Sequence, residues 1–147
     1  ILAGQLQGKL RTSNMYVFTD DGKIEYVATN PFEVENEMTK FLSELKILIN
    51  ENLNIEELFF YASLIHLVFV KIHPMSDGNG RLGRLLEKWF IAEKLGEKAW
   101  FLQSEKMYYQ NHQNYYQNIR QLGLEYENLD YSKALVFLLM LPKSLEL

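Results

Sequence analysis

The stretch IHPMSDGNGRLGRLLEKW, residues 72–89, joins a nearly continuous apolar segment to an amphipathic one. Its residues 73–84 contain a histidine, a carboxylate, a Gly-Asn-Gly run and two arginines that stand three residues apart. The apolar spacing predicts a helix that begins at Asn79 or Gly80 and runs to Leu95, with Gly96 as its C-terminal cap. The buried face of this helix is expected to carry Leu82, Leu86, Trp89 and Phe90.

The start of this helix has the composition of a phosphate-binding site. Unpaired backbone N–H groups and the helix dipole attract anions to a helix N-terminus. Gly78 and Gly80 remove side chains that would keep phosphate oxygens away, and Asn79 can add an amide donor between them. Arg81 and Arg84 lie on a different face from the apolar residues, where each guanidinium can grip a phosphate.

Two neighbouring side chains indicate a reaction as well as binding. Asp77 borders the anion site, and a carboxylate beside bound phosphates is most simply explained by a Mg²⁺ ion. His73 has an ordinary pKa near ~6.5 and can accept a proton near neutral pH. Together they suggest attack of a hydroxyl on a bound nucleotide phosphate.

Each of these features has an ordinary explanation when it stands alone. A histidine after an apolar helix is usually structural, a Gly-Asn-Gly run is usually a turn, and spaced arginines usually face solvent. Seven defined positions at about one in twenty each coincide by chance roughly once in 10⁹ tries. The combination therefore favours the functional interpretation.

Composition limits the class of protein. The 147 residues carry a net charge of −4 and no cysteine, which excludes disulfides and thiolate–zinc sites and argues against a general nucleic-acid binder. No uncharged apolar run is long enough to span a membrane, so we expect a cytoplasmic protein with no membrane contact. The chain begins with Ile1 rather than Met, which leaves open a regulatory segment upstream.

The remaining sequence predicts a mainly α-helical single domain, residues 1–147, with one β-hairpin. Residues 14–29 are expected to form the hairpin, because two runs of β-branched and aromatic residues flank Asp21-Gly22. Capping residues and apolar spacing predict further helices at 30–49, 54–70, 104–122 and 130–142. The first of these is expected to start at Asn30-Pro31 and to bury Leu42, and the last to stop at Pro142.

Residues 73–84, HPMSDGNGRLGR, resemble the signature of the Fic (filamentation induced by cAMP) family, H-x-F-x-[D/E]-G-N-G-R-x-x-R. The resemblance extends on both sides of the motif. GKLRTSNMYVF resembles the stretch that leads into the family's flap hairpin, and NPFEVENEMTKFLSEL resembles the helix after it. SLIHLVFVKIHP resembles the helix that enters the motif, and NHQNYYQNI a downstream segment with a tyrosine pair. Residues 8–120 are covered in all.

The resemblance implies a Fic-type helical bundle that transfers AMP from ATP to a Ser, Thr or Tyr hydroxyl of a target protein. In that scheme His73 is the general base and Asp77 holds Mg²⁺ between the α- and β-phosphates. Gly78, Asn79 and Gly80 form the anion hole, with Asn79 on the α-phosphate.

The same resemblance implies the binding partners of the other residues. Arg81 and Arg84 grip the β- and γ-phosphates, and Tyr115 or Tyr116 forms a wall beside the adenine. The hairpin is the flap that holds the target's backbone by adding a strand. The flap residues expected to meet the target are Tyr16, Val17, Phe18, Ile24 and Tyr26.

One position departs from the pattern, since Met75 stands where the family has phenylalanine. Methionine is apolar and adaptable, so we expect a slightly looser loop and an active site. Gly80 keeps the N-G-R form, whereas the related Doc toxins, which phosphorylate their target, carry a lysine in that region. Two alternatives remain: another nucleotide or phosphodiester donor at the same site, and a nucleotide-binding module without turnover.

Many Fic proteins carry an inhibitory helix, [S/T]-x-x-x-E-[G/N], whose glutamate pairs with the second arginine of the motif, here Arg84. Thr29 and Glu33 have the spacing, but Val34 follows, and no other Ser or Thr fits. The inhibitor therefore lies upstream of Ile1, belongs to a separate antitoxin protein, or does not exist.

Four other features have structural interpretations. His66 is expected to be a core histidine with one local partner. The aromatic stripe of residues 108–119 is expected to pack in the core. Lys71 is expected to interact with its helix dipole, and Lys88 to be solvated.

Overall fold

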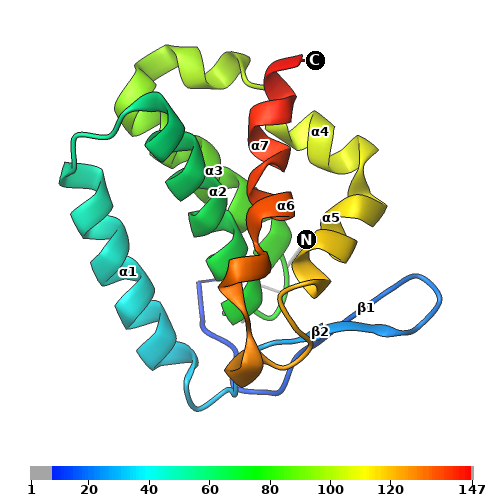
Figure 1. The fold of residues 1–147 in the computed structure, drawn as a ribbon. Coiled ribbons are helices and arrows are strands. Elements are labelled where there is room, and N and C mark those ends of the chain that lie inside the picture. The colour runs from blue at the N-terminus through cyan, green and yellow to red at the C-terminus, as the bar shows by residue number, and fades with distance from the viewer. Residues whose placement is uncertain (1–7, 147) are drawn as a thin grey trace.

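The computed structural model describes residues 8–146 and is mainly helical, with one hairpin at one end of the bundle (Figure 1). This confirms the predicted class. The strands are β1 (Tyr16–Phe18) and β2 (Ile24–Val27), and the α-helices are α1 (Val34–Asn50), α2 (Ile55–Ile72), α3 (Asn79–Leu95), α4 (Ser104–Gln110), α5 (His112–Arg120), α6 (Leu135–Leu138) and α7 (Met140–Lys143). Short 3₁₀ turns are η2 (Gly96–Phe101), η3 (Tyr126–Asn128), η4 (Tyr131–Lys133) and η5 (Ser144–Glu146).

Helix α2 is the centre of the fold and packs against α1, α3, α6 and α7. It begins with a complete capping box, in which the Asn54 side chain accepts from the Glu57 N–H and the Glu57 side chain accepts from the Asn54 N–H. One apolar cluster lies between α1, α2 and α3, and a second lies between α2, the hairpin, α5, α6 and α7. No helix within residues 8–146 has both the length and the apolar character needed to cross a bilayer.

Helices α2 and α3 approach each other most closely at Gly83. A Cβ at this position would lie 2.8 Å from Cδ2 of His66 and 3.0 Å from Cγ1 of Val70. The contact therefore requires glycine and sets the buried face of α3, which carries Asn79, Gly83, Glu87, Lys88, Phe90 and Ile91. The predicted face was wrong in part, because Trp89 is exposed and Leu82 and Leu86 are only half-buried.

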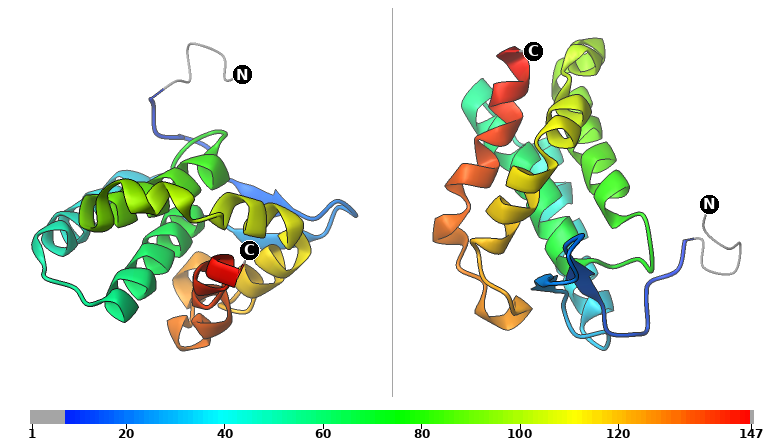
Figure 2. Two further views of the ribbon diagram at one scale, coloured as in Figure 1. Left: turned by 90° about the horizontal axis from the view of Figure 1, so that it is seen from above. Right: turned by 90° about the vertical axis from the view of Figure 1, so that its right-hand side faces the viewer.

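The hairpin lies at the end of the bundle where α2 ends and α3 begins (Figure 2). Its turn contains Gly22 at a φ of 81°, a left-handed conformation that favours glycine. Tyr16 pairs with Val27 and Val17 with Tyr26, and the register shifts after Val17. At the end of β2 the Val27 N–H donates to the carbonyl of Leu124, which follows α5, at 2.8 Å. This bond connects the hairpin to the helical part of the fold.

Helix α1 begins later than predicted. The Asn30 side chain accepts from the Phe32 N–H at 3.0 Å and so caps a separate turn over residues 31–33, and the helix starts at Val34. Leu42 is exposed on the outer face of α1, contrary to the expectation that it would be buried, whereas Val34, Phe41 and Leu45 are buried as predicted.

The single helix predicted over 104–122 is two helices, α4 and α5, which meet at Asn111. Asn111 leaves the helical conformation, with φ −113° and ψ 32°. Both its backbone N–H and its side-chain amide donate to the Met107 carbonyl at 3.0 Å, so they end α4. Its own carbonyl accepts from the Tyr115 N–H, which is the first hydrogen bond of α5, so Asn111 is both the C-cap of α4 and the N-cap of α5.

The C-terminal helix predicted over 130–142 is also divided, into η4, α6 and α7, and it does not stop at Pro142. Proline lacks the N–H that would bond the carbonyl of Leu138, four residues earlier. In this fold the Ser63 hydroxyl of α2 donates to that carbonyl at 3.2 Å. The orphaned acceptor is thus satisfied by tertiary packing, and the helical path continues past the proline.

Candidate active site at the start of helix α3

The loop between α2 and α3 begins at His73, which is the C-cap of α2. Its φ of 53° and ψ of 57° place it in the left-handed region, where it is the one non-glycine residue with positive φ among residues 8–146. This conformation turns the chain out of α2 toward the Gly78–Gly80 run.

Arg11 fixes the backbone of this turn from the N-terminal segment. Its Nε donates to the His73 carbonyl at 2.6 Å, and its Nη2 donates to the carbonyls of Ile72 and Thr29 at 3.1 and 2.5 Å. Its own N–H donates to the Pro74 carbonyl at 2.8 Å. The guanidinium is buried and satisfies carbonyls at the end of α2 that would otherwise lack partners.

The imidazole of His73 is largely removed from solvent. Its pKa is lowered from 6.5 to about 4, mainly by burial, which outweighs a hydrogen bond to the Val70 carbonyl that raises it; the charge of Arg11 also lowers the pKa and that of Asp77 raises it. The ring is therefore neutral at neutral pH, as a proton acceptor must be.

The hydrogen bonds of His73 define which nitrogen is free. The Tyr26 hydroxyl donates to the Val70 carbonyl at 3.0 Å and lies 3.3 Å from His73 Nδ1. Because the hydroxyl hydrogen points to the carbonyl, the oxygen accepts from Nδ1–H, and the lone pair of the neutral ring is on Nε2. Nε2 has no hydrogen-bond partner within residues 8–146, so it is the nitrogen open to a substrate proton.

The N-terminus of α3 presents backbone N–H groups at the Gly-Asn-Gly run. The Leu82 N–H donates to the Gly78 carbonyl at 2.9 Å, so the N–H groups of residues 79–81 precede the intrahelical bonds. Gly78 has a φ of 82°, which favours glycine. A Cβ at Gly78 would lie 3.4 Å from Nη2 of Arg81, and one at Gly80 would lie 3.4 Å from Nη1 of Arg84. The two guanidiniums thus lie against the two glycines.

The side chain of Asn79 has a different place from the predicted one. Its Oδ1 accepts from the Met75 N–H at 2.9 Å, its Nδ2 donates to the Met75 carbonyl at 2.8 Å, and the residue is buried. Asn79 therefore holds the loop in shape and offers the anion site its backbone N–H. Met75 itself is half-buried, and these two bonds fix its backbone.

Asp77 and Arg81 form an exposed ion pair beside the helix start. The Oδ2 of Asp77 lies 3.3 Å from Nη2 of Arg81, and its Oδ1 accepts from the Gly78 N–H at 2.6 Å. An exposed pair of this kind contributes only about 0.2–1 kcal/mol, so a phosphate or cation can replace either partner at little cost.

Residues 8–146 could hold Mg²⁺ only with the help of a bound substrate. Residues 8–146 contain no cluster of three or more His, Cys, Asp or Glu side chains that could hold a metal ion. Mg²⁺ is, however, commonly held by one carboxylate together with substrate phosphates and water. Asp77 is an exposed carboxylate next to the phosphate-binding N–H groups, which fits that mode.

A groove of about 940 Å³ adjoins the two arginines, and we call it the α3–α5 groove. Its volume is in the range that holds a nucleotide-sized ligand. The lining residues are Arg81, Arg84, Leu85, Glu105, Tyr108, Tyr109, Gln110, His112, Tyr115 and Tyr116. The structure therefore brings both motif arginines together with both predicted adenine-side tyrosines, although these lie more than 30 residues apart in the sequence.

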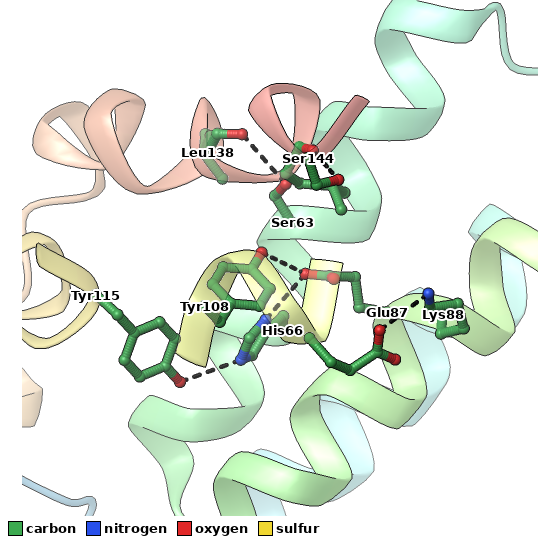
Figure 3. A network of polar contacts seen from close by, with 10 residues as sticks. Ser63, His66, Glu87, Lys88, Tyr108, Tyr115, Leu138 and Ser144 are labelled. Carbon is green, nitrogen blue, oxygen red and sulfur yellow. Dashed lines mark hydrogen bonds and ion pairs between the residues drawn. The ribbon is translucent and has the colours of Figure 1, made fainter. Parts of the chain in front are cut away.

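Tyr115 is held at the groove by a buried polar network (Figure 3). His66 Nδ1 lies 2.9 Å from Glu87 Oε2, which also accepts from the Tyr108 hydroxyl at 2.7 Å. His66 Nε2 lies 3.1 Å from the Tyr115 hydroxyl. The interpretation of His66 as a core histidine is thus correct, but it has two partners, and both Tyr108 and Tyr115 line the groove.

The expectation that Lys88 is solvated was wrong. Its ammonium is buried, donates to the Leu102 carbonyl and lies 3.1 Å from Glu105 Oε2. A lysine takes this position because α3 leads directly into η2, whose end presents a free carbonyl. Lys71 is buried too, where it donates to the Gly123 carbonyl at 3.1 Å and lies 4.6 Å from the Tyr26 ring centroid.

The hairpin side chains divide into two groups. Tyr16, Phe18 and Ile24 are exposed, as a docking strand requires, and Val17 is half-buried. Tyr26 is only 2% exposed, with its hydroxyl directed at His73, so its side chain faces the site from inside.

Sequence reasoning gave no role to Arg11, Glu87 and the Tyr26 hydroxyl. Arg11 stands in the stretch that resembles the family's approach to the flap. His73 is 62 residues later in the sequence, and only the fold brings the two residues into contact. Glu87 falls at a position where the helical pattern of α3 turns inward, and a charged residue there is a signal for a buried partner.

Comparisons with known proteins agree with this geometry. Residues 1–91 match the Fic/DOC family. The fold resembles that of a Fic family protein from Desulfovibrio desulfuricans G20, with 22% identity and a TM-score of 0.72 over 95% of this chain and 39% of that one. It also resembles a Fic domain containing signaling protein from Bacteroides thetaiotaomicron VPI-5482, with 23% identity and a TM-score of 0.67 over 95% of this chain and 53% of that one. The chain thus spans about two-fifths to a half of these solved structures. The chain belongs to the Fic/DOC family.

Proposed function

We propose that the protein is an adenylyltransferase that moves AMP from ATP to a hydroxyl of a target protein. One observation carries the proposal: a histidine whose Nε2 has no partner among residues 8–146 stands five residues before Gly78, the N-cap of a glycine-lined helix start that two guanidiniums flank. Family membership supports transferase chemistry in general, and this arrangement supports nucleotidyl transfer in particular.

The nucleotide would bind with its phosphates at the N-terminus of α3. The N–H groups of Asn79, Gly80 and Arg81 would donate to phosphate oxygens, and Arg81 and Arg84 would balance the phosphate charge. Asp77 would hold Mg²⁺, which neutralises charge on the α- and β-phosphates. The base would extend into the α3–α5 groove toward Tyr115 and Tyr116.

In the transfer step, Nε2 of His73 takes the proton of the target hydroxyl. The hydroxyl oxygen forms a bond to the α-phosphorus, and the bond between that phosphorus and the bridging oxygen of the β-phosphate breaks. Pyrophosphate leaves with the electron pair. Preorganisation would supply much of the rate acceleration, because the base, the phosphate and the N–H groups that bind it would need no rearrangement during the reaction.

The target would be held by the exposed part of the hairpin. Tyr16, Phe18 and Ile24 offer apolar contacts, and β1 has a free edge, since the two-stranded sheet consists of β1 and β2. An extended target segment can add to such an edge through backbone hydrogen bonds.

The test is label transfer from ATP. The protein is incubated with Mg²⁺, cell lysate and ATP radiolabelled either at the α- or at the γ-phosphate, with His73→Ala as the blank. Protein-bound α-label that disappears in the variant would support AMP transfer. Label from the γ-position alone would mean phosphoryl transfer and contradict the proposal, and ATP binding without label in either lane would favour a binding module.

A further inference from the structure

Tyr26 connects the hairpin to the histidine that would act as base. It lies in β2, yet its side chain is buried and its hydroxyl touches two groups at the end of α2. These are the Val70 carbonyl at 3.0 Å and His73 Nδ1 at 3.3 Å. The Tyr26 and His73 rings meet edge-on, with centroids 6.1 Å apart and an interplanar angle of 65°.

The tyrosine ring is also held by a buried cation. The ammonium of Lys71 lies 4.6 Å from its centroid, in cation–π range. Lys71 also donates to the carbonyl of Gly123, and the next carbonyl, that of Leu124, accepts from the N–H of Val27 in β2. The segment 123–124 therefore holds both the cation above the ring and the strand that carries it.

The direction of the hydrogen bonds gives the hydroxyl a specific task. A tyrosine hydroxyl has one hydrogen, and here it goes to the Val70 carbonyl. Its oxygen can then only accept, which requires the proton of the neutral His73 ring on Nδ1. The opposite tautomer would place an N–H at the open Nε2, and an N–H there cannot take a proton from a substrate.

We propose that Tyr26 is a positioning residue for His73: its hydroxyl sets the tautomer and the ring orientation that leave Nε2 free, and it ties the base to the hairpin. The inference rests on the proposed function, since it assigns His73 as the base. It adds that the hairpin expected to hold the target along β1 also holds the base through Tyr26 of β2, so the hydroxyl to be modified and its proton acceptor are positioned by one hairpin.

The test is Tyr26→Phe, which removes the hydroxyl and keeps the ring under Lys71. Tyr126→Phe is the matched control, because it removes a tyrosine hydroxyl that donates to Glu37 Oε2 at 2.7 Å, away from the site. Nitrogen NMR of the imidazoles reports the tautomer directly, and the chain has three histidines, so His73 can be assigned by its loss in His73→Asn.

In wild type and in Tyr126→Phe we expect one His73 tautomer, with the proton on Nδ1. In Tyr26→Phe we expect a mixture of tautomers, a fall of at least about tenfold in the rate of α-label transfer to lysate protein, and an unchanged Kd for ATP. An unchanged tautomer and an unchanged rate would show that the Val70 carbonyl suffices and would overturn the proposal. A wild-type His73 protonated on Nε2 would overturn it as well.

The tautomer is measured without turnover, so the two proposals fail separately. If wild type transfers no AMP but Tyr26→Phe alters the tautomer, the positioning role stands and the reaction is another one. If AMP transfer occurs and Tyr26→Phe matches Tyr126→Phe in every measurement, only the positioning role is lost.

Discussion

His66 lies within α2 and His73 is the C-cap of the same helix, and the two histidines have opposite surroundings. Both donate from Nδ1, His66 to the carboxylate of Glu87 and His73 to the hydroxyl of Tyr26. The difference is at Nε2, which meets the Tyr115 hydroxyl in His66 and has no partner among residues 8–146 in His73. A histidine within a closed network stabilises structure, whereas one with a single fixed nitrogen and a single free one can accept a proton.

The backbone makes the same distinction. His66 has ordinary helical geometry, and Gly83 packs directly against its ring. His73 is left-handed and held by Arg11 at its carbonyl, so the chain leaves the helix at this residue and turns toward α3. The two histidines therefore differ because His66 lies inside α2 and His73 lies at its end, and residue type alone does not distinguish them.

The largest expected effect separates the two histidines by activity. His73→Asn keeps a residue that tolerates the left-handed conformation, so it should fold. We expect AMP transfer to fall by about 10²–10⁴-fold and the Kd for ATP to change by less than about twofold, since the imidazole serves the chemical step. Radiolabel transfer and calorimetric ATP titration measure the two quantities. A variant that transfers at a tenth of the wild-type rate or better would remove His73 from the role of base.

The same substitution at the other histidine should act on stability. His66→Asn leaves Glu87 Oε2 with Tyr108 alone and removes the partner of Tyr115, and a buried polar group left without its hydrogen-bond partner costs about 1–3 kcal/mol. Urea unfolding of His66→Asn and His73→Asn, followed by circular dichroism, compares them directly. Equal losses of unfolding free energy in both variants would contradict the comparison.

A smaller effect is expected at the phosphate end of the groove. Arg84→Ala should weaken ATP binding by about 1.5–3 kcal/mol, the range for a charge-assisted hydrogen bond, and AMP should bind almost as in wild type because it lacks the β- and γ-phosphates. Lys106→Ala, an exposed cation on α4, is the control for net charge. An Arg84→Ala protein that holds ATP as tightly as wild type would exclude Arg84 from phosphate binding.

The smallest effect concerns pH. Burial lowers the pKa of His73 to about 4 in the folded state, whereas an unfolded histidine titrates near 6.5. Between these values the unfolded chain binds the additional proton, so the stability that depends on a neutral His73 is lost as the pH falls from 6.5 toward 4. The difference in unfolding free energy between wild type and His73→Asn should shrink over that window by less than about 1.4 kcal/mol per pH unit. Urea titrations at several pH values measure it, and a constant difference would mean that His73 titrates at its ordinary pKa when folded.

Much of the site was predictable because it depends on local geometry. Gly78 adopts a positive φ, which favours glycine, and Arg81 and Arg84 are three residues apart, which places them on one side of the helix. Both requirements act over a few residues, so they are visible in the sequence. The helix start at Asn54 and the Asp21-Gly22 turn are likewise local, and both formed as predicted.

The contacts that the sequence did not reveal join distant segments. Asn79 was expected to face phosphate. In the structure its side-chain amide forms hydrogen bonds with the backbone N–H and carbonyl of Met75. Lys88 was expected in solvent, but η2 presents the Leu102 carbonyl to it. A polar side chain has many possible partners, and its actual one depends on which backbone groups the fold leaves unsatisfied.

The sequence by itself determined a helical chain with one hairpin, a glycine-rich helix start with two arginines, and a histidine shortly before it. These follow from backbone preferences and periodicity, which act over a few residues. The tertiary structure decided which histidine has a free nitrogen, which lysines are buried and how the hairpin reaches His73 through Tyr26. Those outcomes depend on the satisfaction of buried polar groups by distant segments, such as Arg11 and His73, which are 62 residues apart, and no local pattern encodes such pairings.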